Sequence, residues 1–388
     1  MWRLTRFGEI VWGWGSLSYL SQLKGSRALL VTSRGALKRL GFVDRAAGYL
    51  AEGFGEVRVY EGIEPNPRVS TALKLAKFMA GYKPDTIVAL GGGSVMDAAK
   101  AAWILYECPS LSLEDVIRDS GLIPRLGSKA KLVAVPTTSG TGSEVSRGCV
   151  LTDDETQVKY AIVSLNLVPT LAILDPELPA SMPRDLTADS GMDAMSHALE
   201  SHASKAASDF TKPLSLSAFT TIWTYLRRAY GDPGDREARE KMHYAQCIAA
   251  LAFTNAGTGA VHAISHVISV PLGLSHGRAN AVLMPYVVYY NAQTRPDPYL
   301  DLALSVGIDS TEEDVGFELA SALLDYNKRL GIPQSFSEVG ANERVLISRV
   351  EKYMSYILGS APMRTNPRSM AAEDVKEVVR LAWSGELG

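Results

Sequence analysis

The sequence contains little cysteine: its 388 residues include three, Cys108, Cys149 and Cys247, which are widely spaced and form no CxxC pair. This usage excludes a disulfide framework or a cysteine-based zinc knuckle and is typical of reduced, cytoplasmic thiols. Long uninterrupted apolar runs are also missing, so we expect no membrane-spanning helix. Residues 1–15 show no apolar core of a signal peptide. We therefore expect a cytoplasmic protein without a membrane partner.

An excess of one charge is likewise absent, because 39 lysines and arginines face 42 acidic residues and the net charge is −3. Nucleic-acid surfaces usually show a basic excess, so we expect no nucleic-acid partner. The apolar fraction of 46% is ordinary for a globular protein, and the length predicts two domains.

Short apolar runs alternate with amphipathic stretches in the first half of the chain. The expected strands are residues 27–33, 57–63, 85–94, 131–138 and 171–179, and the expected helices are residues 68–82 and 95–107. This alternation predicts βαβ units and a mostly parallel sheet. From about residue 180 only helical periodicity remains, with GDPGD at 231–235 separating two helices. We predict an α/β domain at 1–179 and an all-helical domain at 180–388.

Glycines lie between an expected strand and an expected helix, at Gly91, Gly92 and Gly93, followed by Ser94. Glycine lets the backbone approach a ligand closely, and a helix N-terminus offers free N–H groups and partial positive charge. These features suit a pyrophosphate. A tight turn without a ligand explains the same glycines, and the pattern is not the usual GxGxxG.

A second loop, PTTSGTGSEVS at 136–146, also follows an expected strand and is rich in hydroxyl groups. Thr137, Thr138, Thr141 and Ser146 offer hydrogen bonds to a sugar or a phosphate. Both loops are expected at the carboxyl edge of the parallel strands, where open α/β sheets bind nucleotides. Loop capping remains an alternative explanation of the hydroxyl groups.

Histidine is scarce, and three of the six histidines lie within residues 262–276. Asp193 and His197 are four residues apart in an expected helix, as are His262 and His266, so each pair shares a helix face. His276 follows on an expected loop. One such pair is often a salt-bridged helix face, but a carboxylate with several imidazoles suits Fe(II) or Zn(II). The remaining histidines, interpreted as structural, are His202 and His243.

Four motifs carry a family resemblance: GGGSVMDAAK at 91–100, PTTSGTGSEVS at 136–146, GMDAMSHALESHAS at 191–204 and HAISHVISVPLGLSHGRANAVLMPYVVYYN at 262–291. They resemble the iron-containing (group III) alcohol dehydrogenases, particularly butanol dehydrogenases and the alcohol dehydrogenase half of bifunctional aldehyde/alcohol dehydrogenases. The similarity runs nearly end to end. It implies an N-terminal Rossmann-like dinucleotide domain, a C-terminal helical domain, an active site in the cleft between them, and a family in which homodimers are plausible.

The resemblance also implies residue roles. The implied metal ligands are Asp193, His197, His262 and His276, for Fe(II) or alternatively Zn(II). His266 faces the nicotinamide instead, and it is the candidate for moving a proton in catalysis. Asp97 belongs to the family's GGGSxxD signature, although an acid in the first helical turn is equally consistent. The implied cofactor residues are Asn66, Gly92, Gly93, Ser94, Thr137, Thr138, Ser146 and Lys159.

Two positions depart from the family pattern. Family members commonly end the first strand with aspartate, whereas this chain has Ser33 followed by Arg34, with Lys38 and Arg39 in the next turn. A dinucleotide site with arginine and without the acid favours NADP(H) over NAD(H), the alternative being that these are ordinary solvated charges.

The second departure is Gly148, in SEVSRGCVLTD at 143–153, where butanol dehydrogenase-like relatives carry an aromatic residue. Its absence either enlarges an apolar substrate pocket or marks a local backbone requirement. Phe253 and Trp223 are the aromatic residues considered for refilling that volume.

Two other readings stay open: a dehydroquinate synthase-like or glycerol dehydrogenase-like enzyme on the same fold, and a non-catalytic protein that binds nucleotide and metal. A polyhydroxy acid would need several basic residues near the motifs, and the side chains there are mostly apolar or hydroxyl-bearing. The sequence favours a dehydrogenase of primary alcohols and their aldehydes.

Overall fold

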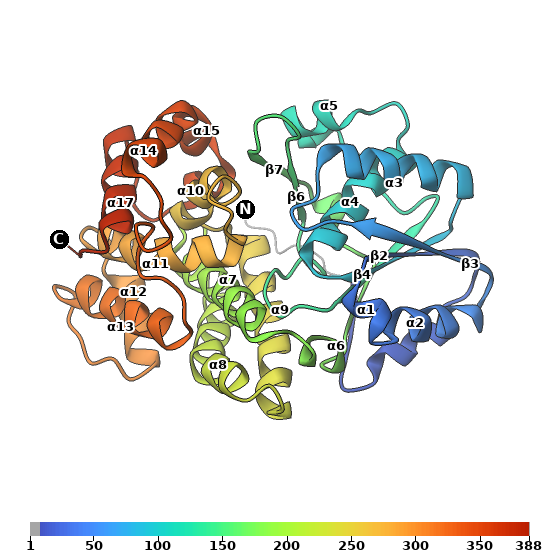
Figure 1. Ribbon diagram of the computed structural model, residues 1–388, viewed down its shortest axis with the longest axis horizontal. Helices are drawn as coiled ribbons and strands as arrows, with labels where there is room; N and C mark the ends of the chain where they lie inside the picture. The colour runs from blue at the N-terminus through green and yellow to red at the C-terminus, as the bar shows by residue number, and fades with distance from the viewer. Residues whose placement is uncertain (1–7, 388) are drawn as a thin grey trace. The chain divides into compact units, whose positions relative to one another are not determined.

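The computed structural model describes residues 8–387; residues 1–7, part of the segment considered above for a signal peptide, and residue 388 lie outside the described residues. The chain divides between Ser181 and Met182 into two compact units (Figure 1). Strands occur only in the first unit among residues 8–387, and the second is helical. This arrangement confirms the predicted fold class, an α/β unit followed by an all-α unit.

A six-stranded sheet, parallel throughout, forms the centre of the first unit in the order β1-β8-β5-β4-β2-β3. Its strands are β1 (Glu9–Trp12), β2 (Gly25–Ser33), β3 (Phe54–Ile63), β4 (Thr86–Gly91), β5 (Lys131–Pro136) and β8 (Leu171–Leu174). Strand β1 was not predicted, because four half-exposed residues at a sheet edge carry no clear periodicity. The strand predicted at 171–179 ends earlier, at Leu174, since a short helix begins after Pro176.

Side chains of the central strands pack on both faces of this sheet. Leu29 and Val31 of β2 pack with one helical layer, whereas Leu30 packs with the other. Figure 1 shows α3 and α4 on one face and α1 and α2 on the opposite face. Burial on both faces explains why these strands read as continuous apolar runs. The helices of this unit are η1 (Ser16–Gln22), α1 (Ala36–Arg39), α2 (Phe42–Ala51), α3 (Val69–Tyr82), α4 (Gly93–Glu107), α5 (Leu113–Arg118), η2 (Ser120–Leu122), η3 (Leu165–Leu167) and α6 (Glu177–Ala180).

A separate two-stranded antiparallel hairpin, β6 (Gly148–Thr152) with β7 (Lys159–Val163), follows the hydroxyl-rich loop. It was not predicted either. Cys149, Leu151 and Ile162 of the hairpin are buried in a cluster with residues of α4 and α5. The packing of the hairpin on α4 therefore ties the segment after the loop to the helix that follows the glycines.

The second unit consists of helices packed around one large apolar cluster. As predicted, the GDPGD stretch separates two helices, and Asp235 caps the later one by accepting a hydrogen bond from the Ala238 N–H at 3.0 Å. The helices are α7 (Arg184–Ala203), α8 (Lys212–Gly231), α9 (Arg236–Ala256), α10 (Ala260–Ile268), α11 (His276–Ala292), α12 (Asp297–Ser305), α13 (Val315–Arg329), α14 (Glu343–Lys352), α15 (Met354–Gly359), α16 (Ala361–Thr365) and α17 (Ala372–Ser384).

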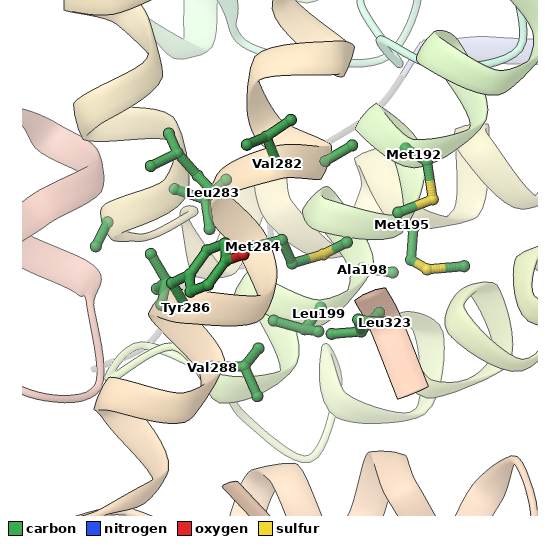
Figure 2. Close-up of a cluster of buried hydrophobic side chains, with 14 of the residues drawn as sticks. Met192, Met195, Ala198, Leu199, Val282, Leu283, Met284, Tyr286, Val288 and Leu323 are labelled. Carbon is green, nitrogen blue, oxygen red and sulfur yellow. The ribbon is translucent and has the colours of Figure 1, made fainter. Parts of the chain in front are cut away.

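Helices α7 and α11 are held against one another by this cluster. Met192, Met195 and Leu199 of α7 are buried together with Leu283 and Met284 of α11, as Figure 2 shows. Much of the rest of α7 is buried as well, including polar side chains. Buried polar groups require partners, so α7 is the element on which a polar site is expected to assemble.

Among residues 8–387, no single helix is long and apolar enough to cross a membrane. Helices α9 and α10 meet the length and composition requirement only together, and the pair is bent by 101°.

Candidate metal centre and cofactor site

Three predicted metal ligands meet in the second unit. Asp193 of α7, His262 of α10 and His276 of α11 each offer one ligand atom, and these atoms lie within 4.8 Å of one another. The Nε2 atoms of both histidines are 3.8 Å from Asp193 Oδ1. Asp193 and His262 are buried, and His276 is partly exposed. One carboxylate and two imidazoles are a donor set that fits Fe(II) or Zn(II).

His276 begins helix α11 and does not lie on a loop, so its predicted placement was wrong. Ser275 caps the helix by accepting a hydrogen bond from the Arg278 N–H at 3.1 Å. Asp189 of α7 accepts from Ser275 Oγ at 2.6 Å and from Arg278 Nε at 2.8 Å. A Cβ atom at Gly277 would clash with the Asp189 carbonyl oxygen. Gly277 therefore permits the close approach of α11 to α7 that brings His276 to the site.

His197 lies beside this group without joining it. Its ring stacks on that of His262, with centroids 4.6 Å apart, and on that of Phe253, with centroids 4.3 Å apart. No nitrogen of His197 is among the atoms grouped within 4.8 Å in the described part of the chain. The structure thus brings together three of the four predicted ligands and places the fourth against one of them.

His266 lies one turn after His262 on α10 and is buried. Its ring centroid is 5.2 Å from that of His276 and 6.2 Å from that of His262. It is a neighbour of the three grouped ligands but is not one of them. This position is compatible with its predicted separate role.

Two other histidines, interpreted above as structural, are buried in the helical unit. His202 Nδ1 is 3.0 Å from Ser215 Oγ, and its Nε2 is 3.5 Å from Asp301 Oδ2. Burial lowers the pKa of His202 and lowers the pKa of His243 to about 3, so both rings are neutral near pH 7.

Sequence reasoning missed two polar residues at the metal centre. Glu200 Oε2 is 2.5 Å from Nδ1 of His262. Asn280 Nδ2 is 2.8 Å from Asp193 Oδ1 and 3.2 Å from His276 Nε2. Helical spacing was the available signal, since Glu200 lies two turns after Asp193 on α7 and Asn280 lies one turn after His276 on α11.

The predicted phosphate loop is a sharp turn between β4 and α4. Gly91 ends the strand, Gly92 is the N-cap and Gly93 begins the helix, so the glycines lie at the predicted junction of strand and helix. A Cβ atom on Gly92 would lie 3.1 Å from the side chain of Thr138. The glycine turn and the hydroxyl-rich loop are therefore packed together, as expected for two loops at one edge of the sheet.

The other predicted cofactor residues of this unit lie near the two loops or at the ends of strands. The Asn66 N–H donates to Ser94 Oγ at 3.2 Å, and Asn66 has a positive φ of 53°. Thr137 follows β5 directly, and Lys159 begins β7 and is buried. Ser33 ends β2. Of the remaining predicted cofactor residues, Arg34 follows β2, and Thr138 and Ser146 lie in the hydroxyl-rich loop.

Asp97 ties α4 to the hydroxyl-rich loop and to the hairpin. It accepts hydrogen bonds from Ser143 Oγ at 2.8 Å and from the Val150 N–H at 3.1 Å. Helix α4 begins at Gly93 and has no acid in its first turn, so the alternative explanation of Asp97 as a first-turn acid was wrong. Burial raises the pKa of Asp97.

Lys100, one turn further along α4, reinforces this connection. Its fully buried Nζ donates to the carbonyl oxygens of Ser146 at 2.9 Å and Gly148 at 2.8 Å, and to Ser146 Oγ at 3.2 Å. Burial lowers the pKa of Lys100, although the nearby carboxylate of Asp97 opposes this shift. The predicted cofactor residue Ser146 is thus positioned by a lysine that the motif analysis did not single out.

We expect Lys100→Met to lower the free energy of unfolding of the first unit by about 3 kcal/mol, because it leaves buried acceptors unpaired and a buried carboxylate without its neighbouring cation. Urea denaturation measures this change. The matched control is Lys74→Met on the exposed side of α3, which should stay within about 0.5 kcal/mol of the original protein. Equal stabilities of the two variants would contradict the assignment.

Gly148 starts β6, and neither its backbone nor its surroundings require glycine. Its φ is outside the left-handed region, and an added Cβ would meet only the Ile162 carbonyl oxygen, at 3.8 Å. The structure thus gives no support to a backbone requirement at this position. Trp223 was considered above for filling the space left by the missing aromatic side chain at position 148. It packs against Phe219 and Tyr326 at ring-centroid distances of 5.9 and 4.7 Å. Its ring is part of the helical core.

Both halves of the chain match profiles of one protein family. The profile described as iron-containing alcohol dehydrogenase matches residues 8–176. The profile described as the C-terminal part of the Fe-containing alcohol dehydrogenase family matches residues 187–383.

Individual relatives agree with these profiles. The NADPH-dependent butanol dehydrogenase of Clostridium saccharobutylicum is 40% identical and matches 99% of each chain. An aldehyde-alcohol dehydrogenase of Streptococcus pneumoniae is 35% identical over 95% of this chain and 44% of its own length. The iron-containing alcohol dehydrogenase structure from Thermococcus thioreducens superposes with a TM-score of 0.90 at 36% identity, covering 100% of both chains. The chain therefore belongs to the iron-containing alcohol dehydrogenase family and is an oxidoreductase of that class.

Proposed function

We propose that this alcohol dehydrogenase interconverts primary alcohols and their aldehydes, prefers NADP(H) to NAD(H), and uses Fe(II), with Zn(II) as the alternative metal. The observation that carries the proposal is the convergence of Asp193, His262 and His276 from three helices within 4.8 Å. The family resemblance adds His197 as a fourth ligand, and its ring already stacks on that of His262. The proposal assigns metal binding to the helical unit and dinucleotide binding to the α/β unit.

A divalent metal held by this donor set supplies Lewis-acid chemistry toward the oxygen of an alcohol or aldehyde. The nicotinamide cofactor supplies the hydride acceptor or donor at its C4 atom. The residues of the chain bind and orient these groups. Burial of Asp193 and His262 keeps bulk water from the ligands and strengthens their interaction with a cation.

We assign the cofactor phosphates to the turn from Gly92 to Ser94. Here the N-terminus of α4 offers unpaired N–H groups and partial positive charge. Thr137 and Thr138 lie at the end of the neighbouring strand β5 and offer hydroxyl groups to the same ligand. Lys159 and Asn66 complete the proposed set with a positive charge and an amide.

His266 is proposed to face the nicotinamide and the reacting carbon. This role is supported by the position of His266, which lies one turn beyond His262 and outside the group of ligand atoms. The ring offers a hydrogen bond and a route for the proton that leaves the alcohol oxygen.

The proposal is tested with metal-free protein reloaded with Fe(II), Zn(II), Co(II) or Ni(II) separately and assayed with each nicotinamide cofactor. We expect oxidation of primary alcohols with NADP⁺ to depend on the added metal. Demonstrated cofactor binding without turnover of any alcohol or aldehyde would instead indicate a non-catalytic protein.

Gly148 is proposed to enlarge the apolar substrate pocket, since neither backbone conformation nor local crowding explains the glycine. Catalytic efficiency is then expected to rise from ethanol to hexanol, with each buried methylene contributing up to about 0.8 kcal/mol. Gly148→Phe should remove this gain for the long alcohols and leave ethanol oxidation nearly unchanged. Steady-state kinetics over the alcohol series measure the effect. A flat series that the substitution does not alter would contradict it.

We also propose a cytoplasmic location and a homodimeric state. The scarcity of cysteine supports the first, and none of the three cysteines forms a disulfide in the described part of the chain. The second is proposed from the family resemblance, and sedimentation analysis tests it directly.

A further inference from the structure

Glu200 is a buried carboxylate with two different partners at the metal centre. The residue lies on α7 and is 4% exposed. Oε1 accepts a hydrogen bond from the Val261 N–H at 2.7 Å, and Oε2 lies 2.5 Å from Nδ1 of His262. A carboxylate is not expected in such a buried place unless both oxygens are bonded, and here both are.

We propose that Glu200 is a positioning residue of the metal centre, which sets both the orientation and the tautomer of the His262 imidazole. A carboxylate oxygen accepts hydrogen bonds, so this contact places the proton on Nδ1 of His262. The other nitrogen, Nε2, then carries the lone pair of the ring, and this atom is 3.8 Å from Asp193 Oδ1 and 3.4 Å from Asn280 Nδ2. This inference rests on the proposed function, because it concerns the same metal site.

Carboxylates that hold a metal-binding histidine in this way raise the basicity of the imidazole and restrict its rotation. The geometry of α10 makes this restriction effective. The same carboxylate binds the N-terminus of the helix that carries His262, so the Glu200 side chain holds both the helix backbone and the imidazole ring.

A simpler role for Glu200 is capping of α10, and the structure allows the two roles to be separated. The helix has a second cap, because Asn366 Oδ1 accepts from the Ala260 N–H at 3.1 Å. Capping by Glu200 uses only Oε1, whereas the imidazole contact uses only Oε2. A substitution that retains the first oxygen and replaces the second therefore tests the positioning role without removing the cap.

Glu200→Gln is that substitution. Its amide oxygen is expected to face the Val261 N–H, since the amide NH₂ group would meet a donor there. The NH₂ group then faces Nδ1 of His262, which must accept the hydrogen bond and leave the proton on Nε2. We expect Zn²⁺ to bind about 10- to 100-fold more weakly, measured by competition with a chromophoric chelator. The melting temperature of the metal-free protein should change by no more than about 3 °C.

Asn366→Ala is the matched control, because it removes the other cap of α10 and leaves the Glu200–His262 contact in place. It should lower the melting temperature without a comparable loss of Zn²⁺ affinity. Equal Zn²⁺ affinities of the original protein and Glu200→Gln would overturn the inference and leave the proposed function standing. An equal loss of affinity in Asn366→Ala would also overturn it, since displacement of the helix would then explain both variants.

Two further observations complete the test. If the original protein itself binds no Zn²⁺ and no other divalent metal, the proposed metal site fails, and the inference fails with it. Should Glu200→Gln not fold, a long-range ¹H–¹⁵N spectrum of the histidine side chains reports the tautomer in the unmodified metal-free protein. A proton on Nδ1 of His262 supports the inference, and a proton on Nε2 overturns it.

Discussion

Replacing His262 or His276 by alanine is expected to abolish tight metal binding and to lower kcat/KM for alcohol oxidation by about 1,000-fold or more. Each substitution removes one of three ligand atoms that lie within 4.8 Å of one another. A metal acting as Lewis acid contributes several kcal/mol to the stabilisation of developing charge, and about 4 kcal/mol corresponds to this factor. Metal content after dialysis and steady-state kinetics measure the two losses separately.

His266→Ala is the control variant for these two substitutions. It removes an imidazole from the same helix, one turn away, whose nitrogens are outside the ligand group. We expect metal content to be retained and kcat to fall by about 100-fold, which is the lower end of the usual contribution of a proton-transferring side chain. Loss of metal from this variant to the same extent as from His262→Ala would show that the division of roles is wrong.

A preference for NADP(H), by about 10- to 100-fold in kcat/KM, is the second large effect that we expect. Strand β2 ends at Ser33, which carries no negative charge to repel a 2′-phosphate, and Arg34 follows it. Arg34 Nε lies 3.9 Å from the position of a Cβ on Gly62, so the guanidinium lies near the neighbouring strand β3. Hydrogen bonds to a charged group contribute about 1.5–3 kcal/mol each, which corresponds to the expected preference.

The ion pairs of the structure indicate which basic residue is expected to bind the 2′-phosphate. Lys38 is already engaged, at 3.2 Å from Asp44 and 3.5 Å from Glu61, so we assign the phosphate contact to Arg34. Arg34→Ala is expected to reduce efficiency with NADP⁺ about tenfold and to leave NAD⁺ nearly unaffected, with Lys38→Ala as the control that changes neither strongly. Ser33→Asp should shift the preference toward NAD⁺. Equal or better efficiency of the original protein with NAD⁺ would refute the assignment.

Local sequence patterns determined those parts of the protein that depend on near neighbours in the chain. The buried runs at β2, β4 and β5 are apolar because both faces of the sheet are covered, and the glycine turn after β4 follows from a strand that leads into a helix. Asp193 and His197, like His262 and His266, share a helix face because the helical repeat places residues i and i+4 together. Spacing alone was enough for these inferences.

Tertiary structure decided which of those residues meet, because partners distant in sequence are chosen by packing and not by local periodicity. Glu200 contacts His262 across 62 positions, and Lys100 reaches the Gly148 carbonyl across 48. His197 has the spacing of a ligand, yet stacking on Phe253 and His262 places it beside the ligand group. Strand β1 is defined only by its pairing with β8, more than 160 residues later. Such contacts depend on the whole arrangement of helices and strands, which no single segment encodes.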